Sequence, residues 1–215
     1  MRLVLASASP SRRRLLHDAG ISPEVQVSSV DEDALTAALT AEHGVLAPAD
    51  LALALAQAKA RDVAARVAGS TVGADDDADH VDVLVVGCDS IFELDGVAFG
   101  KPLTAAVARE RIAAMSGRRG LLHTGHWVIR GDHQAGCTTT TALEFASMSP
   151  AEIDAYVATG EPLQVAGSFT LDGRSAPFIR RIDGDPSNVV GLSLPTLRDL
   201  AGQVGVDWPD LWSDA

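Results

Sequence analysis

Cysteine is scarce in this sequence. Only Cys88 and Cys137 occur among 215 residues, and two cysteines so far apart exclude a disulfide-stapled scaffold and a thiolate zinc cluster. The first residues also lack the arrangement of a signal peptide, in which a charged region comes before an apolar one. No apolar run approaches the length of a membrane span. We therefore expect a soluble, cytoplasmic protein with no membrane partner.

Positive charge is also scarce. Lys and Arg total 17 against 29 Asp and Glu, which gives a formal net charge of −12. This balance disfavours binding of a nucleic acid polymer through its phosphates, so any phosphate site must be a local basic island. Lys59 and Lys101 are the only lysines. Their compact ammonium groups suit phosphate oxygens, and solvated surface charge is the alternative interpretation.

The chain is long enough, with 47% hydrophobic residues, to bury one core or a bilobed pair of smaller ones. We expect one domain over residues 1–215. The polar segment 69–82 is expected to be an acidic surface loop, because it has too few apolar residues to join a core. Its aspartates lack the glycine and the distal glutamate that a calcium-binding loop needs.

Strand-like and helix-like segments alternate along the chain, which is typical of an α/β protein. A hairpin is expected at Asp95-Gly96. Residues 131–136 are expected to connect two strands. The expected strands are 2–6, 83–87, 120–130 and 138–146, and the expected helices are 9–20, 51–67, 104–115, 149–156 and 195–203.

Small serines occupy the turn between the first strand and the first helix. Ser7 and Ser9 precede a helix whose free N–H groups and positive end favour a bound anion. At least one arginine of the run 12–14 could bind phosphate through two parallel hydrogen bonds. An ordinary exposed basic helix face is the alternative.

Two acidic residues are candidates for catalysis. Asp89 follows the β-branched run 83–87, so we expect it at the carboxyl end of a buried strand, where sites of α/β proteins gather. A carboxylate there could position and deprotonate water, although Asp89 could equally form a turn. Glu32, in Val30-Asp31-Glu32, is either a metal ligand or part of an acidic loop.

The sequence resembles the Maf family over nearly the whole chain, in the order and spacing of LASASPSRRRLL, VDE, AQAKA, GCDSIFELDGVAFGKP, MSG, AGSFTLDG and GDPSNVVGLSLP. The resemblance implies an α/β fold with a mixed central sheet flanked by helices, bilobed around a cleft and related to the inosine triphosphatases. It also implies a house-cleaning nucleoside triphosphate pyrophosphatase. Such an enzyme splits its substrate between the α- and β-phosphates into a nucleoside monophosphate and pyrophosphate.

The resemblance also implies roles for individual residues. Asp89 matches the family's proton acceptor, and a divalent cation, Mg²⁺ or Mn²⁺, is implied with Glu32 as its ligand. The remaining matches to substrate-binding positions are Ser7, Arg12, Glu32, Lys59 and Lys101.

Base selection is implied at three further positions, where this chain has Ser11, Ser90 and Asp172. Family members that act on thymidine and uridine triphosphates usually have Arg, Thr and Gln there, and those that act on 7-methylguanosine triphosphate have Trp, Gln and Glu. This chain matches neither pattern. We expect Asp172 in a strand-like segment, where a buried carboxylate could accept hydrogen bonds from guanine; a turn with Gly173 is the alternative.

Two other functions are compatible with the sequence. A nucleotidyltransferase also begins with a small-residue loop and an arginine after its first strand, although its loop is rich in glycine. A nucleotide-sensing regulator of cell division without significant turnover is the non-enzymatic alternative. The sequence does not give the oligomeric state, and a homodimer is one expectation.

Overall fold

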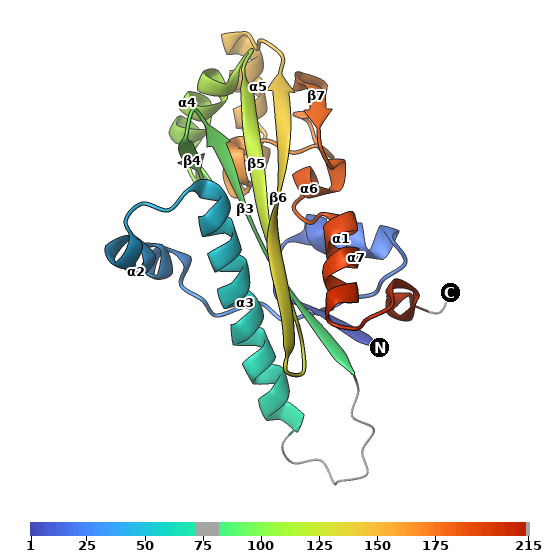
Figure 1. Cartoon of the computed structure of the whole chain (residues 1–215). Coiled ribbons are helices and arrows are strands. Elements are labelled where there is room, and N and C mark those ends of the chain that lie inside the picture. The colour runs from blue at the N-terminus through green and yellow to red at the C-terminus, as the bar shows by residue number, and fades with distance from the viewer. Residues whose placement is uncertain (72–81, 214–215) are drawn as a thin grey trace.

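A computed structural model of the chain describes residues 1–71 and 82–213. Its centre is a seven-stranded sheet in the order β2-β1-β3-β5-β6-β7, with β4 paired to β3. Figure 1 shows β3, β5 and β6 as the long strands of this sheet. The strands are β1 Arg2–Leu5, β2 Glu24–Val25, β3 Val83–Leu94, β4 Val97–Phe99, β5 Arg119–Arg130, β6 His133–Phe145 and β7 Ile179–Asp183.

The sheet is mixed, as expected for this fold class. β2, β1 and β3 run parallel, with Leu5 opposite Val86. β3, β5, β6 and β7 are antiparallel to their neighbours, with Asp89 opposite Gly125. The parallel part therefore meets the antiparallel part at β3, which is the strand that carries Asp89.

Helices flank the sheet (Figure 1). α3 lies along the long strands, whereas α4 and α5 lie at one end and α1 and α7 at the other. No helix within residues 1–71 and 82–213 combines the length and the hydropathy needed to cross a bilayer. The helices are α1 Pro10–Asp18, α2 Glu32–His43, α3 Pro48–Thr71, α4 Ala105–Met115, α5 Pro150–Ala158, α6 Pro186–Val190 and α7 Leu194–Gln203, with short 3₁₀ turns at Glu161–Gln164, Ala166–Ser168, Ala176–Phe178 and Trp208–Leu211.

Alternation along β3 divides the interior, because successive side chains of a strand point to opposite faces. Val86 joins a core formed with α1 and α7, which we call the α1–α7 core. Further along the same face, Phe92 joins a core formed with α4 and α5, the α4–α5 core. Val85 and Ile91 face α3 instead. The two largest cores therefore lie on two halves of one sheet.

Two glycines let α3 approach the sheet closely. A Cβ at Gly87 would lie 2.3 Å from the Ala56 carbonyl oxygen, and one at Gly125 would lie 2.2 Å from that of Ala52. Only glycine leaves room for such contact between backbones. The close approach places Lys59, one turn beyond Ala56 on α3, over the middle of β3.

Most expected elements are confirmed, and the differences concern their extents. The hairpin at Asp95-Gly96 has left-handed φ values of 52° and 80°, as a tight turn of this kind requires. The expected strand 83–87 continues to Leu94, and β6 begins at His133, so residues 131–136 are not a long connection. Of the expected loop 69–82, residues 69–71 continue α3, and 72–81 lie outside the described residues.

Gly87→Ala is expected to lower the free energy of unfolding by about 1–3 kcal/mol, the usual cost of overpacking a close contact. The added methyl would also lie 2.8 Å from the Cβ of Ala60, so α3 would have to move. Urea denaturation would measure the change. Gly202→Ala in α7 is the control, because nothing lies within 4 Å of its added Cβ. Equal stability of both variants and wild type would contradict the close-packing argument.

Candidate functional site

The candidate site lies at an uncovered part of one edge of β3. β1 pairs with this edge at Val83–Val86, and β4 pairs with it at Phe92–Leu94. No strand of the described chain covers residues 87–91 between them. The last bond on the β1 side runs from Ala6 N to Val86 O, at 2.8 Å. The backbone groups of residues 87–91 on this edge are therefore open to contacts other than a strand.

Asp89 lies within this gap and not at the end of its strand, so the expected position at the carboxyl end is wrong. β3 continues because β5 pairs with it through Glu93 and β4 pairs with its last residues. It is β1 that ends here, at Leu5. Asp89 thus lies just beyond the carboxyl end of the neighbouring parallel strand.

Arg12 occupies the place that a continued β1 would have taken. Its Nη1 donates to Cys88 O at 2.9 Å and to Ser7 Oγ at 3.0 Å. Its Nη2 donates to Ser90 Oγ at 2.9 Å, and its Nε donates to Gly191 O at 2.6 Å. Arg12 is buried. The Ser7 turn, the edge of β3 and the end of α6 are all held by one guanidinium.

The hydrogen bonds of Arg12 leave little for a ligand. Four bonds to neutral acceptors use four of the five N–H groups of a guanidinium. Among the described residues, no carboxylate forms an ion pair with Arg12, so its charge is not neutralised by direct contact. Arg12 can supply positive potential and one N–H, but the expected two parallel bonds to a phosphate do not fit this arrangement.

A buried polar network extends from this site across the sheet and was missed by sequence reasoning. Ser90 Oγ lies 2.9 Å from Thr124 Oγ1, which donates to Asn188 O at 3.3 Å. Asn188 Nδ2 donates to the carbonyls of Leu122 and Thr139 at 3.3 and 3.1 Å. Asn188 is fully buried. The available signal was a single asparagine before the apolar pair Val189-Val190, just ahead of Gly191.

Lys59 joins the two candidate acids. Its Nζ lies 2.5 Å from Asp89 Oδ1 and 2.7 Å from Glu32 Oε1. The side chain of Lys59 is 11% exposed and that of Asp89 is 12% exposed, whereas that of Glu32 is 47% exposed. The ammonium group is therefore shared between a buried carboxylate and a half-exposed one.

The two carboxyl groups are shifted in opposite directions. Burial raises the pKa of Asp89 above its usual range, although the charges of Lys59 and Arg12 oppose the rise. Burial also acts to raise the pKa of Glu32, but its hydrogen bond to Lys59 and the charges of Lys59, Lys101 and Arg12 outweigh burial and lower that pKa. Opposite shifts of neighbouring acids are typical of sites that move protons.

Glu32 begins a helix, so its assignment to an acidic loop is wrong. It is the first residue of α2, and Asp31 caps that helix by accepting a hydrogen bond from Ala34 N at 2.9 Å. The signal was present in the sequence, because an aspartate followed by acidic residues and an Ala- and Leu-rich run favours a helix start. α2 has no buried residue.

Lys101 is exposed in the turn between β4 and α4. Its charge nevertheless contributes to the lowered pKa of Glu32, together with Lys59 and Arg12. Three cations from separate parts of the chain thus act on one carboxylate.

The three candidate base-selecting residues are in different settings. Ser11 is half-buried in the first turn of α1, and Ser90 Oγ is bonded within the Arg12 network. Asp172 is exposed in a bend, so the expected strand-like segment and buried carboxylate are both wrong. Glu161 forms this bend by accepting a hydrogen bond from Arg174 N at 2.9 Å. The structure brings Ser90 to Arg12 but shows no contact of Asp172 with the site.

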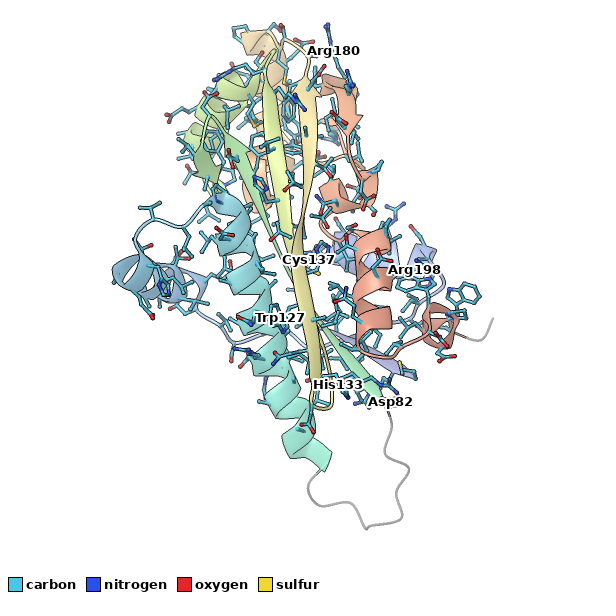
Figure 2. The ribbon with its side chains drawn as sticks, in the orientation of Figure 1. Asp82, Trp127, His133, Cys137, Arg180 and Arg198 are labelled. Atoms are coloured by element: carbon cyan, nitrogen blue, oxygen red, sulfur yellow. The ribbon has the colours of Figure 1, made fainter. Side chains whose placement is uncertain are left out.

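Other reactive side chains do not compete for the chemistry. Burial raises the pKa of Cys88 to about 11, so its thiol stays protonated and is a poor nucleophile. Cys137 lies midway along β6, as Figure 2 shows, and is exposed. Within the described residues, no group of three or more His, Cys, Asp and Glu side chains could hold a metal ion.

Fold and site together define a class of protein. It is an α/β protein with a mixed sheet, in which cations collect around a buried carboxylate at a gap in one strand's edge. Such an arrangement suits an anionic substrate with several phosphates and a water molecule directed by the carboxylate.

The chain belongs to the Maf-like protein family, which matches residues 2–204. It is 50% identical over 222 aligned residues to a nucleoside triphosphate pyrophosphatase of Leifsonia xyli subsp. xyli, covering 100% of this chain and 98% of that protein. It is 51% identical over 216 residues to a protein of the same name from Streptomyces coelicolor, covering 100% and 96%. The resemblance identified from the sequence motifs is confirmed.

Arg12→Lys is expected to lower the free energy of unfolding by about 1–3 kcal/mol, the cost of leaving a buried acceptor unpaired. Lysine retains the charge, but its ammonium cannot reach four acceptors that a planar guanidinium spans. Chemical denaturation would measure the change. The control is Arg13→Lys, because Arg13 is exposed on the same helix. If the two variants unfolded at the same denaturant concentration, the bonds of Arg12 would not stabilise the fold.

Proposed function

We propose that the protein hydrolyses nucleoside triphosphates between the α- and β-phosphates, giving a nucleoside monophosphate and pyrophosphate. Two relatives at about 50% identity over essentially the whole chain are named nucleoside triphosphate pyrophosphatases, which supports the assignment. Removal of non-standard or modified nucleotides, a house-cleaning role, is the proposed purpose. A nucleotidyltransferase or a regulator without turnover is not favoured by these relatives.

The observation that carries the proposal is the shared ammonium group of Lys59. Its single positive charge is shared between Asp89 and Glu32, whose carboxylate oxygens lie 2.5 and 2.7 Å from Nζ. A triphosphate brings about four negative charges, and phosphate oxygens are good acceptors for an ammonium group. Transfer of a Lys59 bond to a phosphate oxygen would free a carboxylate oxygen of Asp89 to accept a proton from water.

The division of labour among the side chains follows from their settings. Asp89 is the base, because it is buried, its pKa is raised and it lies in the gap of β3. Lys59 and Lys101 bind phosphates, and Arg12 adds positive potential while it fixes the turn at Ser7. Charge placed in advance around the reacting phosphorus stabilises the transition state without reorganisation.

A divalent cation is part of the proposal. The donor set fits Mg²⁺ or Mn²⁺, which bind through one or two carboxylates together with substrate phosphates. Glu32 is half-exposed and ionised by its surroundings, so it is the residue proposed to hold the cation. When bound, the cation would neutralise phosphate charge and polarise the phosphorus centre.

The base preference, location and assembly are proposals as well. Ser11 precedes Arg12 in α1 and Ser90 Oγ accepts a hydrogen bond from Arg12, whereas Asp172 would have to reach the base from an exposed bend. Cytoplasmic location is supported by the free thiol of Cys137, which is exposed and would be stable in a reducing compartment. A homodimer stays a prediction.

Asp89→Asn is expected to lower turnover by about 100-fold or more, because an amide cannot take a proton from water. The fold should persist, since the side chain keeps its size. The measurement is release of pyrophosphate from a panel of ordinary and modified triphosphates with Mg²⁺ or Mn²⁺, with thermal melting as the control. Near wild-type turnover would exclude Asp89 as the base. Release of inorganic phosphate in place of pyrophosphate would exclude cleavage at the α–β bond.

Activity is expected to fall as the pH is lowered, because a protonated Asp89 cannot act as a base. Burial raises the pKa of Asp89, so the acid limb of kcat/KM is expected above the usual aspartate value of about 3.9. Lys59→Met removes the cation that opposes this rise, so its acid limb should move to still higher pH. Residual activity of the variant, measured against pH, tests the shift. As a control, circular dichroism at each pH must show a folded protein. An acid limb of kcat/KM at the same pH in both proteins would contradict the assignment of Asp89 as the base.

A further inference from the structure

The turn between β4 and α4, residues 100–104, carries Lys101 and has an unusual backbone. Leu103 has a φ of 61°, in the left-handed region, and the residue is 63% exposed. A leucine keeps this conformation only where surrounding contacts fix it. One contact is a hydrogen bond from Leu103 N to Leu163 O at 3.1 Å. The other side of the turn is held by an arginine.

Arg111 reaches back from α4 to the end of β4. Its Nη1 donates to Gly100 O at 2.6 Å, and its guanidinium carbon lies 5.4 Å from the centre of the Phe99 ring. A hydrogen bond from a charged donor is stronger than a neutral one, and the contact with the ring adds to it. No ion pair among the described residues includes Arg111. Its interactions are directed at the backbone immediately before Lys101.

The position of Lys101 depends on that backbone. Lys101 is exposed, and a lysine side chain in solvent is free to rotate about several bonds. Its reach is therefore set by where the turn begins. β4 ends at Phe99, which pairs with Phe92 of β3 directly beyond the uncovered residues 87–91, so the turn begins beside the candidate site.

We propose that Arg111 is a positioning residue for the phosphate-binding cation Lys101. By holding the Gly100 carbonyl and the ring of Phe99, Arg111 fixes the turn from which Lys101 extends to the phosphates. Arg111 itself does not touch the substrate. This inference rests on the proposed function, and it concerns one contact that the family assignment does not supply.

The same helix provides a matched control. Arg109 is on α4, two residues before Arg111, and its Nε lies 2.6 Å from Asp154 on α5. Arg109→Ala removes the same charge from the same helix without touching the turn. Arg111→Lys retains the charge but loses the planar group that stacks and donates at once. Together the two variants distinguish an effect on the position of the turn from an effect of the positive charge on α4.

The experiment measures kcat and KM for a nucleoside triphosphate that the wild type hydrolyses, by pyrophosphate release. Arg111→Ala is expected to raise KM by about 3- to 10-fold and to change kcat by less than about twofold, the pattern of lost substrate binding. Arg111→Lys should also raise KM, and Arg109→Ala should leave it unchanged. In a Lys101→Ala background, Arg111→Ala should add less than about twofold, because residues that act through one another are not additive.

Several results would overturn the inference. An equal effect of Arg111→Ala with and without Lys101 would show that Arg111 acts independently of it. An effect of Arg109→Ala as large as that of Arg111→Ala would assign both to helix charge. If Arg111→Ala did not fold, Arg111→Lys would replace it in the same cycle. A wild type that released no pyrophosphate would overturn the proposed function, whereas an impaired Lys101→Ala beside an unaffected Arg111→Ala would overturn only the present inference.

Discussion

The pairing of β3's edge is the constraint on which the site depends. A buried carbonyl must find a donor, and β1 ends at Leu5, before it can supply one to Cys88. After β1 the chain leads into α1, which Ser9 caps and Pro10 begins. Arg12 then donates to Cys88 O at 2.9 Å. The residue that completes the backbone hydrogen bonding therefore also introduces positive charge beside Asp89.

Asp89 is subject to a different constraint, which is the cost of burying a charged side chain. It lies on the face of β3 toward α3, where Gly87 allows the helix to approach. Among the described residues, Lys59 is the one cation that forms an ion pair with it. Burial of an ion pair is costly and is weak evidence for stability. In this site the buried acid is Asp89, whose pKa is raised. The neighbouring acid, Glu32, has a lowered pKa. Retaining such a pair makes sense if the carboxylate is needed for proton transfer.

Local signals in the sequence predicted most of the fold. The helix starts expected near residues 9 and 149, the turn at Asp95-Gly96 and the β-branched run 83–87 each depend on neighbouring residues, and each is confirmed. The extension of β3 to Leu94 depends on pairing with β5 and β4, which lie far along the chain or follow a turn. The expected hairpin at Asp95-Gly96 accounts for the pairing with β4, whereas no local pattern encodes the pairing with β5.

For the same reason, the sequence predicted some residues of the site and not others. The roles suggested by motif spacing led to Arg12, Lys59 and Asp89, and the structure brings these residues together. Asn188 and Arg111 act through carbonyl groups of distant segments, and a carbonyl has no signature in a sequence. The bend at Asp172 is formed by Glu161, a contact between separate turns. The features that the sequence could not predict are therefore the tertiary hydrogen bonds to backbone groups.

The cations Arg12, Lys59 and Lys101 also differ in how firmly the fold holds them. Arg12 is fixed by four bonds, and Lys59 is held between two carboxylates, whereas Lys101 is exposed. They come from α1, from α3 and from the turn before α4, which are separate segments of the chain. A triphosphate that contacts all three would join both halves of the sheet. Binding to the folded state alone stabilises it by mass action, and the stabilisation should fall mainly on the least constrained partner, the turn that carries Lys101.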